Sequence, residues 1–219
     1  MHLMSDDVKH QSLPRPNLRA RRVARTEAQL IQAAGELFLE QGYVSTTLAQ
    51  IAGRAEVAAR TVYVRFKTKA ALFSRVVDQA LVGDVEPVDV AHRPRVQDAM
   101  TADTLAERIA ALADVSVGIA ERAGPMFEVA TQAEGLEPEL AEAAQAGRHA
   151  TAALCRSFWE HAAADGLLAK GARPEYLTVL TDVLLCADTV VHTRRTHGWS
   201  ASLHRSLIID TLTALTSPK

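Results

Sequence analysis

The stretch from residue 44 to residue 73 constrains the fold most, because it predicts two short helices separated by a tight break. Thr47 followed three residues later by Gln50 fits a capping box, in which each side chain accepts a hydrogen bond from the other residue's backbone N–H. Apolar residues at helical spacing give the first short helix one buried face: Leu48, Ile51, Ala52 and Ala55. The sequence therefore predicts an amphipathic helix that starts after Thr47.

A second short helix follows the pair Glu56-Val57, which is too brief to be anything but a turn. Val62 and Phe66 give this helix an inward edge. Its outward face combines hydrogen-bond donors with an aromatic ring: Arg60, Tyr63, Val64 and Arg65. A helix of this kind, held by a partner helix across a short turn, has the geometry that enters a DNA major groove. We therefore expect a helix-turn-helix unit that binds DNA.

Further residues extend this pattern over about 25–80. They are Ala33, Ala34, Leu37, Phe38, Gly42 and Tyr43, then Thr46, Thr47, Ile51 and Ala52, then Thr61, Val62, Tyr63 and Phe66, and finally Lys69, Leu72 and Phe73. With these residues the chain resembles the TetR family of one-component bacterial repressors. The resemblance implies an N-terminal three-helix helix-turn-helix DNA-binding domain and a C-terminal helical domain for ligand binding and dimerisation.

Two positions depart from the pattern of that family. Glu56 stands where the family usually has glycine, and a glutamate is strained there if the turn needs a positive φ. Ala58, Ala59 and Arg60 replace the usual small polar residue, variable residue and glycine, so the second short helix lacks an N-cap hydroxyl worth about 1 kcal/mol.

The composition favours an all-α protein, and the periodicity described below predicts about nine helices. The chain has 219 residues, of which 48% are hydrophobic, and Gly and Pro concentrate near the expected helix ends. Charge is unevenly distributed: residues 1–82 carry 12 Lys and Arg against 7 Asp and Glu, net +5, whereas residues 83–219 carry 12 against 19, net −7. The positive N-terminal part is the expected nucleic-acid end.

The sequence also favours a cytoplasmic protein without a membrane-bound part. Cys155 and Cys186 are the two cysteines, and a chain with its own core needs no disulfide. The first residues are polar and carry acids, which is unlike a signal peptide, and no apolar run reaches the ~18 residues that span a bilayer.

Three domains are expected: a flexible basic arm over 1–22, the DNA-binding domain over 23–82, and the effector-binding and dimerisation domain over 83–219. The arginines of the arm lie directly before the first expected helix: Arg15, Arg19, Arg21, Arg22 and Arg25. They can contact phosphates or the minor groove, as the arms of other helical DNA-binding domains do, or form a solvated tail.

The expected helices follow from apolar periodicity and from capping residues. In the N-terminal part they cover about 25–41, 48–55, 58–66 and 69–82. A linking segment is expected over 83–101, and the capping box of Thr104 and Glu107 then opens a helix that Gly124-Pro125 stops. The remaining helices are expected over 126–134, 139–164, 174–196 and 200–215.

Candidate DNA contacts differ in the basis on which they are assigned. By resemblance, Thr47, Tyr63 and Lys69 contact phosphates, although Tyr63 can instead serve packing. Arg60 and Arg65 suit base reading, because arginine can bond O6 and N7 of guanine, but they can also hold phosphates. The full candidate set is Thr46, Thr47, Ala58, Ala59, Arg60, Thr61, Tyr63, Val64, Arg65, Lys67 and Lys69, and Lys67 is assigned to phosphate or solvent.

The last two expected helices carry more apolar residues than one buried face requires. These residues are Leu177, Leu180, Val183, Leu184, Ala187, Val190 and Val191, then Leu203, Leu207, Ile208, Leu212 and Leu215. They can form plain core in a monomer. The resemblance implies instead a four-helix interface of a homodimer whose two reading helices bind one palindromic operator.

No catalytic pattern is found, so we expect no enzyme, no cofactor and no metal. His161 and Asp165 are four residues apart and can share a metal, but a surface or capping role is favoured. An all-helical enzyme would need a convergent set of titratable residues. A helical protein-interaction module is the other alternative, and it has no use for the capped turn, Tyr63 and Lys69 together.

The resemblance implies a repressor that an unidentified small-molecule effector releases from DNA. The candidates for lining an effector pocket combine apolar walls with a few polar groups: Met126, Phe127, Thr131, Phe158, Trp159, Tyr176 and Asp182. Each of these residues can instead be ordinary core.

Overall fold

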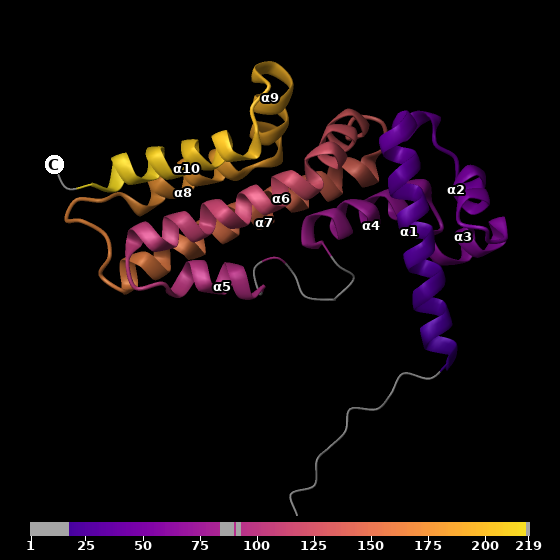
Figure 1. Ribbon diagram of the computed structural model, residues 1–219, viewed down its shortest axis with the longest axis horizontal. Coiled ribbons are helices and arrows are strands. Elements are labelled where there is room, and N and C mark those ends of the chain that lie inside the picture. The colour runs from indigo at the N-terminus through magenta and orange to yellow at the C-terminus, as the bar shows by residue number, and fades with distance from the viewer. Residues whose placement is uncertain (1–17, 84–89, 91–92, 218–219) are drawn as a thin grey trace, which may run out of the picture.

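The computed structural model describes residues 18–83, 90 and 93–217. Within these ranges the protein is all-α, as predicted, and elongated (Figure 1). The helices are α1 (Leu18–Ser45), α2 (Leu48–Arg54), α3 (Ala59–Phe66), α4 (Lys69–Val82), α5 (Pro94–Thr101), α6 (Leu105–Ala133), α7 (Pro138–Ala164), α8 (Pro174–Leu185), α9 (Ala187–His197) and α10 (Ala201–Thr216).

Helices α1 to α4 form one end of the molecule, with α2 and α3 at its tip (Figure 1). The long helices α6 and α7 run along the length of the remainder. Helix α8 packs against α7, and α10 packs against α6. The arrangement leaves α3 far from α8 and α10, at opposite ends of the elongated molecule (Figure 1).

Aromatic packing holds the N-terminal end together. The rings of Phe38 and Phe73 meet edge to face with their centroids 4.8 Å apart, and Tyr43 packs against both. Ile51 of α2 and Val62 of α3 are fully buried against this group. Burying side chains of this size contributes about 1.5 to 3 kcal/mol each, so the predicted apolar faces are the core that fixes α2 and α3 on α1 and α4.

Helix α1 is longer than predicted at its N-terminal end. It starts at Leu18 rather than near Arg25, so the expectation of a flexible segment is wrong for residues 18–22. Leucine, arginine and alanine dominate these positions, and all three are strong helix formers. The predicted stop at Gly42 is a break in helical geometry, with φ 78° and ψ 173°, although α1 as a whole continues to Ser45. Residues 1–17, with Arg15, lie outside the described part.

Two predictions in the middle of the chain are wrong. The expected linking segment contains α5, which begins with Pro94 and buries Val96, Ala99 and Met100. Helix α6 does not stop at Pro125 but continues to Ala133. An interior proline costs about 3 kcal/mol through its missing N–H and its clash with the preceding turn. Here that cost is offset by the apolar residues that α6 buries on both sides of the proline.

The predicted helix over 174–196 is two helices. Cys186 adopts extended geometry between α8 and α9, with φ −66° and ψ 150°, and the two helices bend by 51°. The Thr189 hydroxyl donates to the Val183 carbonyl across this break and so satisfies a carbonyl at the end of α8. No single described helix is long and apolar enough to cross a membrane. Taken together, the bent pair of α8 and α9 is long and apolar enough, by length and composition alone.

Other helix ends lie where the capping residues predicted them. Thr104 and Glu107 form a capping box at the start of α6, and Ser200 caps α10 through the Leu203 N–H. Helix α7 begins at Pro138, whose missing N–H costs nothing at a first-turn position. The starts of α6, α7 and α10 therefore agree with the prediction.

Candidate nucleic-acid interface

The start of α2 is fixed by the predicted capping box. The Gln50 N–H donates to Thr47 Oγ1 at 3.2 Å, and the Thr47 N–H donates to Gln50 Oε1 at 2.8 Å. Such a cap contributes about 1 kcal/mol to helix stability. Thr47 itself is exposed at the tip of the molecule. The free N–H groups of the first turn of α2 therefore face outward beside Thr47, as an anion contact requires.

Arg54 fastens the other end of α2 to α1. Its guanidinium donates to both carboxylate oxygens of Glu40, at 3.0 and 2.9 Å, and to Glu36 at 3.3 Å. The hydrogen bond from Arg54 lowers the pKa of Glu40. This arrangement is not among the predicted features, although two glutamates four apart on one face of a helix are a recognisable signal for an arginine partner.

The turn between α2 and α3 has positive φ at Glu56, so the strain expected there is present. The Val57 N–H donates to the Ala52 carbonyl at 3.0 Å, and the Glu56 N–H donates to the Gly53 carbonyl at 3.2 Å. This pair of bonds is a Schellman motif, in which glycine usually occupies the left-handed position. Glu56 therefore connects α2 to α3 in a left-handed backbone conformation that is unfavourable for any residue with a side chain.

Helix α3 turns its polar face outward. Val62 and Phe66 are buried against the core, whereas Tyr63 is 55% exposed and Val64 is 69% exposed. Arg60 and Arg65 are exposed as well. Ala58 precedes the helix without a side-chain cap, as predicted. The helix thus presents two guanidinium groups, a phenol and a methyl-bearing side chain together at the tip of the molecule.

Lys67 and Thr68 join α3 to α4. Lys67 has φ 58° and ψ −53°, and the Thr68 N–H donates to the Phe66 carbonyl, which makes a strained γ-turn. Thr68 then caps α4 by accepting from the Ala71 N–H at 2.9 Å. This cap is not among the predicted features, although a threonine directly before a helical pattern is an ordinary start signal. Lys67 is exposed, as a phosphate contact or a solvated residue would be.

The structure removes Thr46 from the candidate set. Thr46 is fully buried, and its hydroxyl lies within hydrogen-bond distance of the Gly42 carbonyl, at 2.8 Å, and of the Leu37 carbonyl, at 3.3 Å. A buried hydroxyl that is bonded to carbonyls cannot reach a phosphate. Ala58 and Ala59 are exposed and Thr61 is partly buried, so these three remain beside the outward face of α3.

Lys69 lies at the first position of α4 but is turned toward the protein. Its Nζ donates to the Tyr43 carbonyl at 2.9 Å and lies 4.1 Å from the centroid of the Tyr43 ring. The ammonium group has further donors besides the one that this bond uses. Arg19, Arg21, Arg22 and Arg25 are all exposed on the first turns of α1, which project away from the rest of the molecule (Figure 1).

The seven candidates for an effector pocket do not line one cavity. Met126 belongs to the apolar core of the N-terminal end, whereas Phe158 and Trp159 are fully buried in the core of the larger part. Trp159 Nε1 donates to the Thr181 hydroxyl at 2.9 Å. The other four candidates are exposed or half-buried: Phe127, Thr131, Tyr176 and Asp182. Burial raises the pKa of Asp182.

His161 and Asp165 do not form a metal site. Asp165 pairs with Arg108, and His161 Nδ1 contacts the Ser157 carbonyl at 2.7 Å. Over the described ranges, no three His, Cys, Asp or Glu side chains gather in a way that could hold a metal ion. The expectations of no cofactor and no enzymatic activity stay predictions.

Comparison with known proteins identifies the N-terminal end. Residues 30–76 match the model of the bacterial regulatory proteins of the tetR family. A relative, the HTH-type transcriptional regulator TcmR of Streptomyces glaucescens, is 47% identical over 66 residues, which are 30% of this chain and 29% of that protein. The match thus spans less than a third of that relative.

Solved structures resemble the whole fold. A SmeT–triclosan complex has a TM-score of 0.67 at 20% identity, with 87% of this chain and 90% of that chain covered. NalD of Pseudomonas aeruginosa, the secondary repressor of the MexAB-OprM multidrug efflux pump, has a TM-score of 0.64 at 22% identity, with 88% and 96% covered. The N-terminal end is therefore a tetR-family domain by sequence, and the chain as a whole has the fold of solved TetR-family transcriptional regulators.

Proposed function

We propose that this protein represses transcription by binding a palindromic operator as a homodimer, and that a small-molecule effector releases it. The observation that carries the proposal is the outward face of α3, where Arg60 and Arg65 lie exposed while Val62 and Phe66 fix the helix to the core. In this role α3 enters the major groove, and its two arginines read bases or hold phosphates.

Phosphate contacts surround this reading helix. Thr47 and the free N–H groups of α2 meet one strand, and Tyr63 adds a phenol of similar reach. Lys69 contributes from the start of α4. The exposed arginines of the first turns of α1 add affinity by displacing counterions, now from a helix rather than from a flexible arm.

The dimer forms through α8 and α10, which lie on the side of the molecule away from α5 (Figure 1). Exposed apolar side chains support this interface: Tyr176, Val179 and Val183 on α8, and Leu203 and Leu215 on α10. Val179 and Val183 are four residues apart and so share one helix face. Leu184, considered above as an interface residue, is only 7% exposed and belongs to the protomer's own core.

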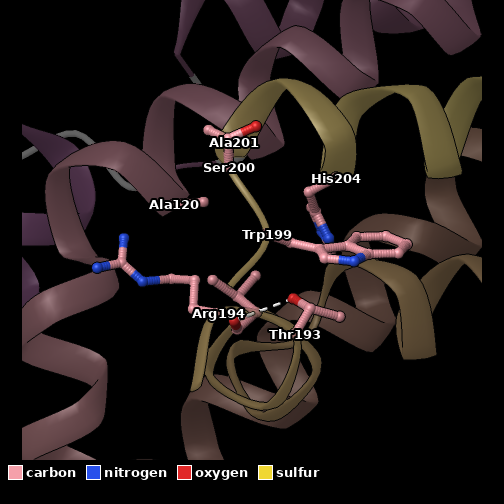
Figure 2. A pocket seen from close by; sticks show the side chains of 8 residues that line it. Ala120, Thr193, Arg194, Trp199, Ser200, Ala201 and His204 are labelled. Carbon is pink, nitrogen blue, oxygen red and sulfur yellow. Dashed lines mark hydrogen bonds between the residues drawn. The ribbon is translucent and has the colours of Figure 1, made fainter. Parts of the chain in front are cut away.

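Release by an effector is supported by the SmeT–triclosan complex, which has this fold. One hollow in the C-terminal part lies between α6, α9 and α10, lined by Arg194, Trp199 and His204 among others (Figure 2). Its volume of about 20 Å³ holds one water-sized group. An effector of ordinary size therefore enters this hollow only if the helices around it separate.

Binding to nonspecific duplex DNA over a range of salt concentrations tests the proposal. We expect log K to fall linearly with log salt, with a slope near −0.9 for each phosphate contact. A double variant, Arg60→Ala with Arg65→Ala, lowers affinity and slope. Arg156→Ala is the matched control, because Arg156 is an exposed arginine on α7. Neither an enzyme nor a protein-interaction module predicts a steep slope, so a flat response would refute the proposed function.

A further inference from the structure

The turn between α6 and α7 is built into the DNA-binding end. Met126 and Ala133 of α6 and Leu140 of α7 are buried in the same apolar cluster as Phe38 and Phe73. The core is therefore continuous from α1 and α4 into the start of α7. A displacement of this turn cannot leave α4 unaffected, because packed cores transmit shifts rather than absorb them.

Two carboxylates at the start of α7 reach the DNA-binding end. Tyr43 Oη donates to Glu137 Oε1 at 2.5 Å, and Thr68 Oγ1 donates to Glu139 Oε2 at 3.1 Å. These partners are 94 and 71 residues apart in the sequence. The Thr68 hydroxyl also accepts from the Ala71 N–H, so it caps α4 and contacts α7 at the same time.

Tyr43 is fixed by ring packing and by a hydrogen bond of its hydroxyl. Its ring stacks on Phe38 with centroids 5.7 Å apart and meets Phe73 at 5.1 Å, and the residue is almost fully buried. Burial, followed by the hydrogen bond and charge of Glu137, raises the pKa of the phenol, which therefore stays protonated and donates. The bond to Glu137 thus fixes the tyrosine at its hydroxyl end.

The backbone carbonyl and the ring of Tyr43 both contact Lys69. The Tyr43 carbonyl accepts from Lys69 Nζ, and the ammonium also lies over the ring. A charge-assisted hydrogen bond and a cation–π contact to one residue restrict a side chain that is otherwise among the most flexible. The position of the ammonium at the start of α4 therefore depends on Tyr43, and Glu137 anchors the hydroxyl end of that tyrosine.

We propose that Glu137, acting through Tyr43, is a positioning residue that sets Lys69 for contact with a DNA phosphate, and that Glu139 supports it by holding the Thr68 cap. The inference rests on the proposed function. It assigns the coupling between the C-terminal domain and the DNA contact to a short chain of side chains: Glu137, Tyr43 and Lys69. Motion of the α6–α7 turn would then reach the DNA contact without any change in α3.

A competing account is purely electrostatic. Glu137 is an anion near a DNA-binding surface, so replacing it with glutamine would by itself strengthen binding to any duplex. The two accounts predict opposite signs. They also differ for Tyr43→Phe, which removes only a hydroxyl, leaves the charge unchanged and keeps the ring that packs on Phe38 and Phe73.

The experiment measures binding of nonspecific duplex against salt for wild type, Tyr43→Phe, Glu137→Gln and the double variant. Each single variant should weaken binding about three- to tenfold, and the double variant should be no weaker than either single one. The salt slope should flatten by about 0.9, the value of one phosphate contact. Glu142→Gln, an exposed glutamate on the same helix, is the matched control and should lower neither quantity.

A Lys69→Met background separates positioning from general destabilisation. In that background Tyr43→Phe should change the slope no further, because the contact it governs is already lost. Stronger binding by Glu137→Gln, additive losses in the double variant, or weaker binding with an unchanged slope would overturn the positioning role. A flat salt dependence of the wild-type protein would overturn the proposed function as well, which keeps the two failures distinct.

Discussion

Replacing Glu56 with glycine should stabilise the protein. Glu56 has φ 55° in the turn between α2 and α3, and its backbone already makes the bonds of a Schellman motif. A left-handed conformation costs a non-glycine residue about 1 to 2 kcal/mol. Glycine avoids that cost but loses about 0.5 to 1 kcal/mol through the greater freedom of its unfolded chain. The net gain should be about 1 kcal/mol in the free energy of unfolding.

Urea unfolding at fixed protein concentration measures this gain, with thermal unfolding as a second readout. For a chain of this size, 1 kcal/mol corresponds to a rise of about 2 to 4 °C in Tm. Glu56→Ala is the matched control, because it removes the charged side chain but keeps the strained backbone. If alanine stabilised as much as glycine, the side chain rather than φ would be the cause. If glycine gave no gain, the turn would not be strained as described.

Three further predictions concern other parts of the chain. Val183→Glu should raise the dimer dissociation constant about tenfold or more, because an unpaired charge would be buried in the interface. Light scattering measures the oligomeric state. Leu39→Glu, at an exposed leucine on α1, is the control. Burial lowers the pKa of His204, and a backbone hydrogen bond with Leu184 raises it by less, so on acidification the unfolded chain binds the proton before the folded protein does. The free energy of unfolding should therefore fall as the pH drops below about 6.5. His204→Leu should reduce this pH dependence in unfolding curves from pH 5 to 8, and an unchanged dependence would contradict the prediction. Arg21→Gln with Arg22→Gln should flatten the salt dependence of DNA binding while sparing base preference, whereas identical slopes would mean that these residues are only solvated.

Local signals predicted the helix starts well. The capping boxes of Thr47 and Thr104 and the cap of Ser200 depend on residues within three positions of one another, so the sequence alone specifies them. The apolar faces around Val62 and Phe66 follow from helical spacing in the same way.

Interactions between distant segments could not be predicted in this way. Pro125 is an ordinary stop signal, and only the burial of α6 against other helices shows why the helix continues. The break at Cys186 has no glycine or proline to mark it. The bond of Tyr43 with Glu137 joins residues 94 positions apart. The effector candidates rest on residue type alone, and residue type does not show which core a side chain enters.

Thr46 illustrates the same limit within the DNA-binding end. It adjoins Thr47, which caps α2 and is exposed, and the sequence does not distinguish the two hydroxyls. In the structure Thr46 points inward to the carbonyls of α1. A difference of one position along an extended segment reverses the direction of a side chain, so neighbouring residues of one type can have opposite roles.

The most direct test of the central claim is selection of bound duplexes from a random library by the wild-type protein and by Arg60→Ala and Lys69→Ala. The wild-type protein should enrich an inverted repeat. Arg60→Ala should relax preference at one base pair in each half-site and cost about 1 to 3 kcal/mol. Lys69→Ala should weaken binding to all duplexes alike. Failure to enrich any sequence, or a base-selective loss for Lys69→Ala with a uniform loss for Arg60→Ala, would contradict the account.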